Sequence, residues 1–454
     1  MSCVDATRPH RGSRRAAAAI GAAIALSALL TASDARGWST PQPFYTGAAR
    51  DVFSIAGDPA GNAFAIIVGE SLDKPLLLME RWAAGNDKFV WSGAQPLPGG
   101  ARNFTNPLNS FDSFQAAAAG DGIGLVVWRE VLPDGTARLF ALTREPPLRF
   151  AGPLAVAGAD LSPRADPSAS VNASGDALVA FRIGRGKSAG RTAFALRRSP
   201  RGIGRPRTLS AGASGKPVAA IGDDGSSVVA WIRGGHVESR RLDSSGKALS
   251  TQRLGNATAD VSISTAVNHK GAGVIAWQDD DGAIRSVRRA APGPFSSSRR
   301  VRAVSRTARV DGLATGVDAR GRTFVAWRER TSSTRRVLAA SAVDGGAFKT
   351  TSLASGQQLG APSLTMRPGG GAIVSLRSPT GWQARIAPRS GVFTDAMTVS
   401  RALFGGDLVV ARAATLAGPT NRVDLVWPQA GDPPDPSGFL IYQSFQDEEA
   451  APAG

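Results

Sequence analysis

One short phrase recurs along the chain and limits what it can fold into. A turn ending in glycine leads into β-branched residues and then a large apolar residue, as in GSSVVAW, Gly225–Trp231. This last residue, here called the anchor, returns roughly every 50 residues. The anchors are Ile67, Trp128, Phe181, Trp231, Trp277, Trp327, Leu376 and Trp427. Such a period indicates an array of units that bury their hydrophobic faces against one another.

Each unit predicts strands and no helix. In the fourth copy we expect strands at Pro217–Ile221, Ser227–Arg233, His236–Leu242 and Leu249–Leu254, with the Asp-Asp-Gly turn ending at Gly225 between the first two. Four short strands repeated in this way are typical of the blades of a β-propeller.

The two ends of the array complement each other. After Trp427 the last unit has room for one further strand, Gly438–Phe445, and a spare strand candidate, Trp38–Thr46, precedes the first unit. The sequence therefore predicts an all-β fold, a single β-propeller over 36–445 with eight four-stranded blades closed by the N-terminal strand. If the long, imperfect first unit is merged or lost as a separate blade, the propeller has seven blades. The alternative to a ring is a pair of smaller β domains. Residues 446–454 are expected to be a disordered tail.

The first 35 residues have the pattern of an export signal. Four arginines within residues 1–15 precede the apolar run AAAAIGAAIALSALL at 16–30, and small residues follow as far as Ala35. We expect export by either the general secretory or the twin-arginine route, followed by cleavage after Ala35. An uncleaved membrane anchor is the alternative. No later stretch is long and apolar enough to cross a bilayer, so a secreted or cell-envelope protein is predicted.

The repeated phrase, xGxxVVAW, resembles the repeats of secreted bacterial β-propeller proteins, which are distantly related to sialidase-type and WD-type propellers. The resemblance covers about residues 38–445. The Asp-box of sialidases, Ser-x-Asp-x-Gly-x-Thr-Trp, occurs in no copy, and neither does the Gly-His…Trp-Asp signature of WD repeats. The resemblance therefore implies a fold and an extracellular setting but transfers no catalytic residue.

Composition removes several kinds of site. The chain has one cysteine and three histidines, so a disulfide framework, a Cys-ligated metal and a multi-histidine metal cluster are excluded. We expect no cofactor and no metal. The run Asp279-Asp280-Asp281 before Gly282 is read as a hairpin turn rather than a calcium site, because it lacks a spaced set of further ligands.

Two periodic features compete as candidate sites. The anchors can be a ladder for stacking sugars, but a position shared by Trp, Phe and Leu favours packing between blades. Acidic residues at the start of first strands and arginines just after the anchors form a charged rim. Antiparallel pairing predicts cross-strand neighbours Asp112 with Arg129, Asp166 with Arg182, and Asp311 with Arg328. The candidate ligand-binding residues are Asp112, Arg129, Asp166, Arg182, Asp260, Asp311, Arg328 and Arg377. A ring of ion pairs is the structural alternative to a ligand-selecting rim.

Charge gives the only indication of a partner. The chain carries 53 Lys and Arg against 36 Asp and Glu, a formal charge of +17. Basic clusters lie at 197–201, 240–241, 285–289 and 299–302. An excess of this size in an exported protein indicates affinity for polyanions. Nucleic acid is disfavoured because these stretches contain almost no aromatic residues. A solvated basic surface is the alternative.

These observations predict a monomeric binding or scaffold protein at the cell envelope or outside the cell, with a protein or an anionic polysaccharide as ligand. The alternative is a glycoside hydrolase or polysaccharide lyase that uses acidic rim residues such as Asp166, Asp260, Glu329 and Asp407 at the channel mouth. No sequence motif identifies a catalytic residue.

Overall fold

The anchor phrase forms the second strand of every sheet. The computed structural model describes residues 42–49, 51–58, 62–68, 76–83, 89–98, 114–131, 137–145, 149–157, 161, 166–184, 190–197, 202–258, 261–291, 293–305, 307–343, 346–367, 369–399, 414–417, 423–430 and 439–446. The expected export signal and the rim residues Asp112 and Asp260 lie outside these ranges. No helix in the part described here is long and apolar enough to cross a membrane.

The described strands form eight antiparallel sheets, the larger of the two blade numbers that the sequence allows. Sheet 1 contains β2 (Asp51–Gly57), β3 (Ala63–Val68), β4 (Leu77–Ala83), β5 (Phe89–Trp91) and the short β6 (Gln95–Pro96). Sheet 2 contains β7 (Phe114–Ala119), β8 (Ile123–Val131), β9 (Ala137–Arg144) and β10 (Ala151–Ala157), with the 3₁₀ turn η2 (Gly120–Gly122) after β7. Sheet 3 contains β11 (Ser168–Val171), β12 (Ala177–Ile183), β13 (Arg191–Arg197) and β14 (Arg207–Ala211). Sheet 4 contains β15 (Ala213–Ile221), β16 (Ser227–Arg233), β17 (His236–Leu242) and β18 (Ala248–Asn256).

The remaining sheets repeat the same order. Sheet 5 contains β19 (Ile263–Val267), β20 (Gly273–Gln278), β21 (Ile284–Arg289) and β22 (Arg299–Arg302). Sheet 6 contains β23 (Arg309–Val317), β24 (Thr323–Arg330), β25 (Arg335–Ala342) and β26 (Lys349–Gly356). Sheet 7 contains β27 (Ser363–Met366), β28 (Ala372–Ser378), β29 (Gly381–Ala387) and β30 (Met397–Thr398). Sheet 8 contains β31 (Ala414–Ala417), β32 (Val423–Ala430), β33 (Phe439–Gln446) and the N-terminal β1 (Gln42–Ala49).

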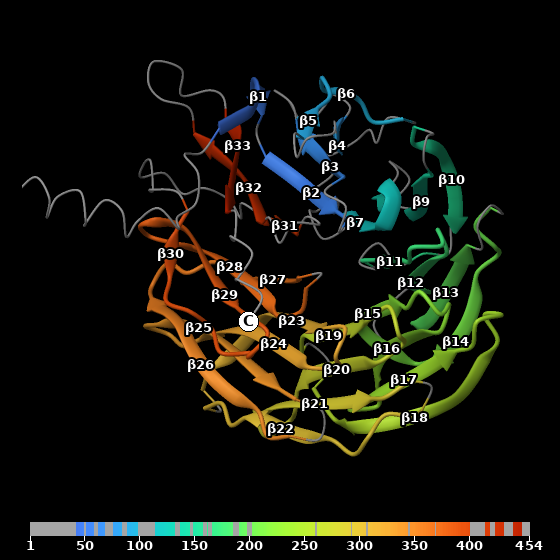
Figure 1. The fold of residues 1–454 in the computed structure, drawn as a ribbon. Coiled ribbons are helices and arrows are strands. Elements are labelled where there is room, and N and C mark those ends of the chain that lie inside the picture. The colour runs from blue at the N-terminus through green and yellow to red at the C-terminus, as the bar shows by residue number, and fades with distance from the viewer. Residues whose placement is uncertain are drawn as a thin grey trace, which may run out of the picture.

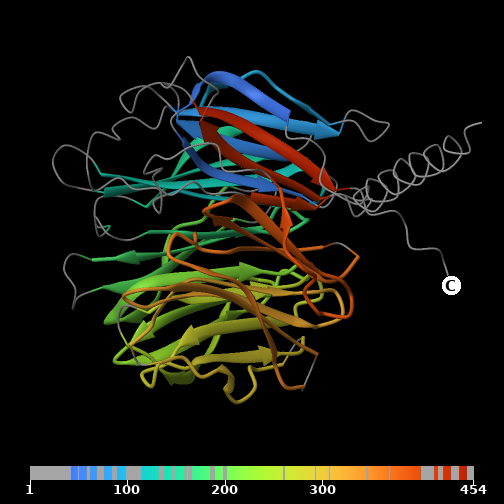
Figure 2. The same ribbon diagram turned by 90° about the vertical axis from the view of Figure 1, so that its left-hand side faces the viewer.

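The sheets follow one another around a ring, with the first strand of each at the centre (Figure 1). Each first strand contacts the first strands of both neighbouring sheets, and β31 contacts β2 to complete the circle. The predicted β-propeller is therefore confirmed. In Figure 2 blue strands from the start of the chain lie beside red strands from its end, and the partner of β1 is β33. The predicted closure by the N-terminal strand is also confirmed, although β1 spans 42–49 rather than Trp38–Thr46. Gln446, the first residue of the expected tail, belongs to β33, and residues 447–454 lie outside the described ranges.

The four strands expected in the fourth copy match β15 to β18, and β16 and β17 have the predicted bounds. Both faces of each central strand are covered. In sheet 4, Val228 and Ala230 pack with Ile275 of sheet 5, whereas Val229 and Trp231 pack with residues of sheet 3. A strand buried on both faces is apolar at every position, which explains the continuous run VVAW. The seven anchors whose side chains are described are at most 2% exposed, as expected for packing between blades.

Because strand direction alternates within a sheet, the hairpins between first and second strands all lie on one face of the ring. We call this face the lower face. Asn172 organises one of these turns. Its Oδ1 accepts hydrogen bonds from the backbone N of Ser174 (3.1 Å) and Asp176 (2.9 Å), while Nδ2 donates to the carbonyl of Gly222 in the next sheet (3.0 Å). Asn268 repeats this arrangement and donates to the carbonyl of Asp318 (2.8 Å). One amide thus shapes a turn and joins two sheets.

Asn172→Asp is expected to lower the free energy of unfolding by about 1–3 kcal/mol, because it replaces the buried donor by an oxygen that faces the Gly222 carbonyl. Denaturant unfolding midpoints measure the change, provided that the slope is unaltered. Asp318→Asn is the matched control. Asp318 occupies the equivalent turn, and its carboxylate accepts hydrogen bonds from the backbone N of Arg320 and Arg322, so the effect should stay within about 0.5 kcal/mol. Equal shifts in the two variants would contradict this role of the amide.

Candidate functional site

The predicted rim pair Asp311 and Arg328 is present on the face opposite the lower face. The two residues are opposite each other in the register of β23 and β24. The Asp311 carboxylate accepts from Arg328 Nε at 2.6 Å and from Nη2 at 2.9 Å, a two-point contact. Arg328 Nη1 also donates to the carbonyl of Leu359, which precedes the next sheet (2.8 Å). This pair therefore holds its own hairpin and the neighbouring blade.

A second rim pair joins two sheets instead of one hairpin. The Arg129 guanidinium, at the end of β8, donates from Nη2 to Asp166 Oδ1 at 3.2 Å, and Asp166 enters the following sheet. The paired register of β11 with β12 begins at Ser168 opposite Ala180, so the expected pairing of Asp166 with Arg182 stays a prediction. Burial lowers the pKa of Arg129, and the negative charge of Asp166 counteracts that shift. Asp166 therefore compensates a nearly buried cation.

Arg377 lies in β28, where its carbonyl accepts from the N–H of Gly360 at 2.9 Å. Four of the described rim residues thus form two ion pairs, Arg129 with Asp166 and Arg328 with Asp311. A ligand would have to break these pairs to use their charges. Among the described residues, this geometry favours the ring of ion pairs over the ligand-selecting rim.

Acidic residues elsewhere in the described chain are engaged in a similar way. Glu80 and Arg144, both nearly inaccessible, form a 3.1 Å ion pair between sheets 1 and 2, with the Arg144 guanidinium 3.5 Å from the centre of the Trp82 ring. Glu329, one of the carboxylates considered for glycoside cleavage, accepts from Trp327 Nε1 at 3.1 Å and faces Arg302 Nε at 3.4 Å.

Asp279, Asp280 and Asp281 bring their carboxylates within 4.8 Å of one another. Asp279 Oδ1 accepts from the backbone N of Ala283 (2.7 Å) and Oδ2 from Arg285 Nε. The first carboxylate of the run is therefore occupied in shaping its hairpin, in agreement with the interpretation as a turn.

Sequence reasoning missed a class of buried arginines. These arginines occupy one register at the end of the third strand and reach back to the preceding sheet. They are Arg144, Arg197 and Arg289. Arg197 binds Glu145 of sheet 2 and the carbonyl of Gly175, and Arg289 donates to Ser226 Oγ of sheet 4 at 3.2 Å. In each case the residue of the second strand that lies opposite the arginine is Gly or Ala, which leaves room for the guanidinium.

This class corrects the interpretation of the basic clusters as solvated surface. Arg197, Arg288 and Arg289 are at most 8% exposed. They were counted in the clusters at 197–201 and 285–289. Their long aliphatic stems allow them to lie inside the protein. Arg197 and Arg288 donate to backbone carbonyls there, and Arg289 donates to Ser226 Oγ. Part of the excess of arginine is therefore structural.

Sheet 5 nevertheless opens into two adjoining basic cavities. The first, the lower cavity, has a volume of about 440 Å³ and lies between the lower-face turns of sheets 5 and 6. Its charged lining residues are Lys270, Arg288, Arg289 and Arg320, and neutral residues such as Asn268 and Thr323 complete it. Lys270 and Arg320 are exposed at its mouth, and Arg288 is buried in its wall.

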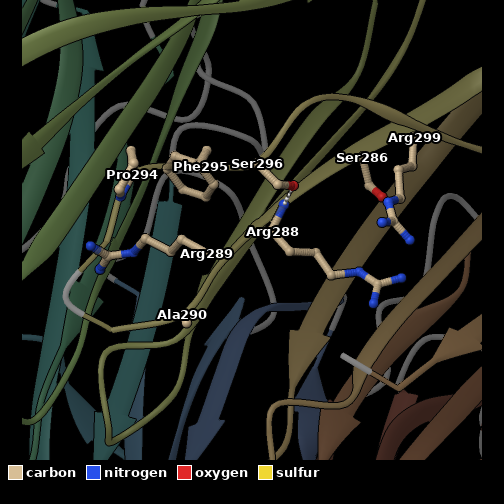
Figure 3. Close-up of a pocket in the computed structure, with 8 residues that line it drawn as sticks. All are labelled: Ser286, Arg288, Arg289, Ala290, Pro294, Phe295, Ser296 and Arg299. Atoms are coloured by element: carbon tan, nitrogen blue, oxygen red, sulfur yellow. Dashed lines mark hydrogen bonds between the residues drawn. The ribbon is translucent and has the colours of Figure 1, made fainter. Parts of the chain in front are cut away.

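The second, the outer cavity, has a volume of about 230 Å³ and follows the end of β21 toward the outside of the ring (Figure 3). Its lining residues are Ser286, Arg288, Arg289, Ala290, Pro294, Phe295, Ser296 and Arg299. The two cavities share the wall Arg288, Arg289 and Ala290.

Neither cavity has an Asp or Glu among its lining residues. Asp318 lies in the adjacent turn, but its carboxylate accepts hydrogen bonds from the backbone N of Arg320 and Arg322. Burial and the neighbouring Arg241 both lower the pKa of Arg289, and Asp224 opposes them only in part. A buried cation without a paired carboxylate is costly, and an anion bound nearby would lower that cost.

No protein family and no curated protein matches the sequence. The structure is similar to polysaccharide lyase Uly1, at 10% identity over 91% of this chain and 92% of that one, with a TM-score of 0.47. It is also similar to a PL25 ulvan lyase bound to -[GlcA(1-4)Rha3S]-, at 12% identity over 76% and 95%, with a TM-score of 0.44.

A third similar structure is a puromycin hydrolase mutant, at 16% identity over 88% of this chain and 62% of that one, with a TM-score of 0.48. Likeness at such identities concerns the fold alone and transfers no activity.

Asp311→Asn and Arg328→Gln are each expected to lower the free energy of unfolding, and the two losses should not add. The coupling energy should be about 1 kcal/mol, because either substitution alone already removes the two-point contact. Unfolding midpoints of the two single variants and the double variant measure the coupling. Arg233 and Glu238 provide the control cycle, since they are 3.7 Å apart with the Arg233 side chain 53% exposed; their coupling should be near zero. Additive effects of the Asp311 and Arg328 substitutions would show that their contact contributes nothing to stability.

Proposed function

We propose that this chain is an exported binding protein for an anionic polysaccharide of the cell envelope, which it holds at the lower cavity. The observation that carries the proposal is a cavity of about 440 Å³ with several cationic and no acidic lining residues. Export is proposed from the signal-like pattern of residues 1–35.

A concave basic site fits a flexible acidic polymer better than it fits the surface of a folded protein, because a polymer chain can enter the cavity and follow its walls. Guanidinium groups bind carboxylate and sulfate oxygens through two parallel hydrogen bonds. Arg288 is already fixed, since it donates from Nη1 to the carbonyl of Val343 (2.6 Å) and lies over the Phe348 ring (4.4 Å). Little of its conformational freedom remains to be lost on binding.

The lining also distinguishes this ligand from nucleic acid. Single-stranded nucleic acid is held largely by stacking of bases on exposed aromatic side chains. The lower cavity has no aromatic lining residue, and Phe295 of the outer cavity is only 4% exposed. Charge recognition without stacking supports an acidic glycan.

The same lining supports binding rather than cleavage at this place. Proton transfer at neutral pH needs a carboxyl, an imidazole or a similar group within reach of the bond that breaks. The residues lining the lower cavity include no Asp, Glu, His or Tyr, and the one amine among them, Lys270, is exposed at the mouth. The groups present at this cavity can neutralise and orient an anion.

The purified chain is expected to bind an acidic polysaccharide such as polygalacturonate saturably, and part of the binding should persist at high salt. At 1 M salt the Debye length falls to about 3 Å, which suppresses diffuse attraction but spares direct contacts. Lys270→Gln combined with Arg320→Gln should lower the affinity at least tenfold. Calorimetric titration at low and high salt measures both effects.

Arg205→Gln combined with Lys247→Gln is the matched control, because it removes the same charge from two exposed residues that line neither cavity. This control should bind like the unaltered chain. An equal loss in both double variants, or binding that vanishes at high salt, would show that net charge alone attracts the polymer. Appearance of new chain ends in the polysaccharide would support the hydrolase or lyase alternative instead.

A further inference from the structure

We propose, on the basis of the proposed function, that the ligand is an extended acidic glycan whose consecutive units occupy the lower and outer cavities together, passing over the end of β21. The site thus binds several consecutive sugar units, and a single sugar acid or a free inorganic anion fills only part of it.

Continuity of the two cavities is the first observation. Arg288, Arg289 and Ala290 line both of them, so one short stretch of backbone separates the space on the lower face from the space on the outer side. Exposed cations stand at the two ends: Lys270 and Arg320 at the lower cavity and Arg299 at the outer one. A linear polyanion matches a path that is basic at its beginning, middle and end.

Opposed arginines at the strand end are the second observation. Neighbouring residues of a strand point to opposite faces of the sheet, and Figure 3 shows Arg288 and Arg289 extending in opposite directions. Arg288 reaches sheet 6 and Arg289 reaches Ser226 of sheet 4. A chain that passes over this strand end meets a cation on both sides of the sheet, whereas a compact anion meets one of them.

Buried polar atoms without partners in the outer cavity are the third observation. Ser286 Oγ and Arg289 Nε have no hydrogen-bond partner, although the two residues are 1% and 5% exposed. Buried polar groups are nearly always satisfied, so each such atom asks for an explanation. A sugar hydroxyl or carboxylate in the outer cavity would supply an oxygen close to the Ser286 hydroxyl.

The test is a titration of the full chain with galacturonate oligomers of increasing length, from the monomer to the octamer, at constant salt. Affinity for whole oligomers is expected to rise at least tenfold between the monomer and the first length that reaches both cavities. Beyond that length it should level off. A second contact made by an already bound chain has this effect because its effective concentration is high.

Variants then separate the two cavities. Arg299→Gln is expected to lower octamer affinity at least fivefold while leaving monomer affinity within twofold, and Arg299→Lys should restore most of the loss. The Lys270→Gln and Arg320→Gln pair should weaken the monomer and the octamer alike. Thermal unfolding of each variant verifies that these exposed substitutions leave the fold intact.

Equal affinity for monomer and octamer, or an Arg299→Gln effect of the same size on both, would overturn this inference while leaving the proposed function in place. Failure of every oligomer and of the parent polysaccharide to bind saturably would overturn the proposed function itself. Inorganic sulfate that competes with the octamer as strongly as the tetramer does would show that the site binds simple anions.

Discussion

Each sheet of this protein can bury its two faces only against the two neighbouring sheets. That constraint determines the chemistry of every strand. Central strands are apolar at consecutive positions, as in Val228–Trp231, because both faces are covered. First strands converge on the axis and carry small residues that bond across the gap, as Ser264 Oγ does with Thr315 Oγ1 at 3.0 Å. Third strands diverge, and arginines such as Arg197 fill and bridge the wider space between blades.

The same constraint explains which features could be predicted from the sequence. The strands of sheet 4 and the buried anchors follow from local patterns of apolar residues and turn-forming glycines. The Asp311–Arg328 pair was predictable because hairpin register links residues close in sequence. The Arg129–Asp166 pair joins different sheets. Its geometry depends on the angle between blades, which no local pattern encodes.

Charge was the least predictable property, since arginine is read from a sequence as a surface residue. Here some arginines are interior cross-links and others line an open site. The register of Arg144, Arg197 and Arg289 opposite a glycine or alanine was a readable signal, because small residues facing long ones leave space for a side chain to lie flat. The two cavities at sheet 5 combine both roles: Arg288 is locked by carbonyls of sheet 6 and still forms part of their shared wall.

Closure of the last sheet has a consequence for the order of folding. The strand synthesised first, β1, completes the sheet whose other strands are synthesised last. Until β33 emerges, β1 has no partner and the first and last blades present open faces. Contacts between such distant segments form slowly because a long loop must close. We therefore expect the ring to become a single cooperative unit only when β1 pairs with β33.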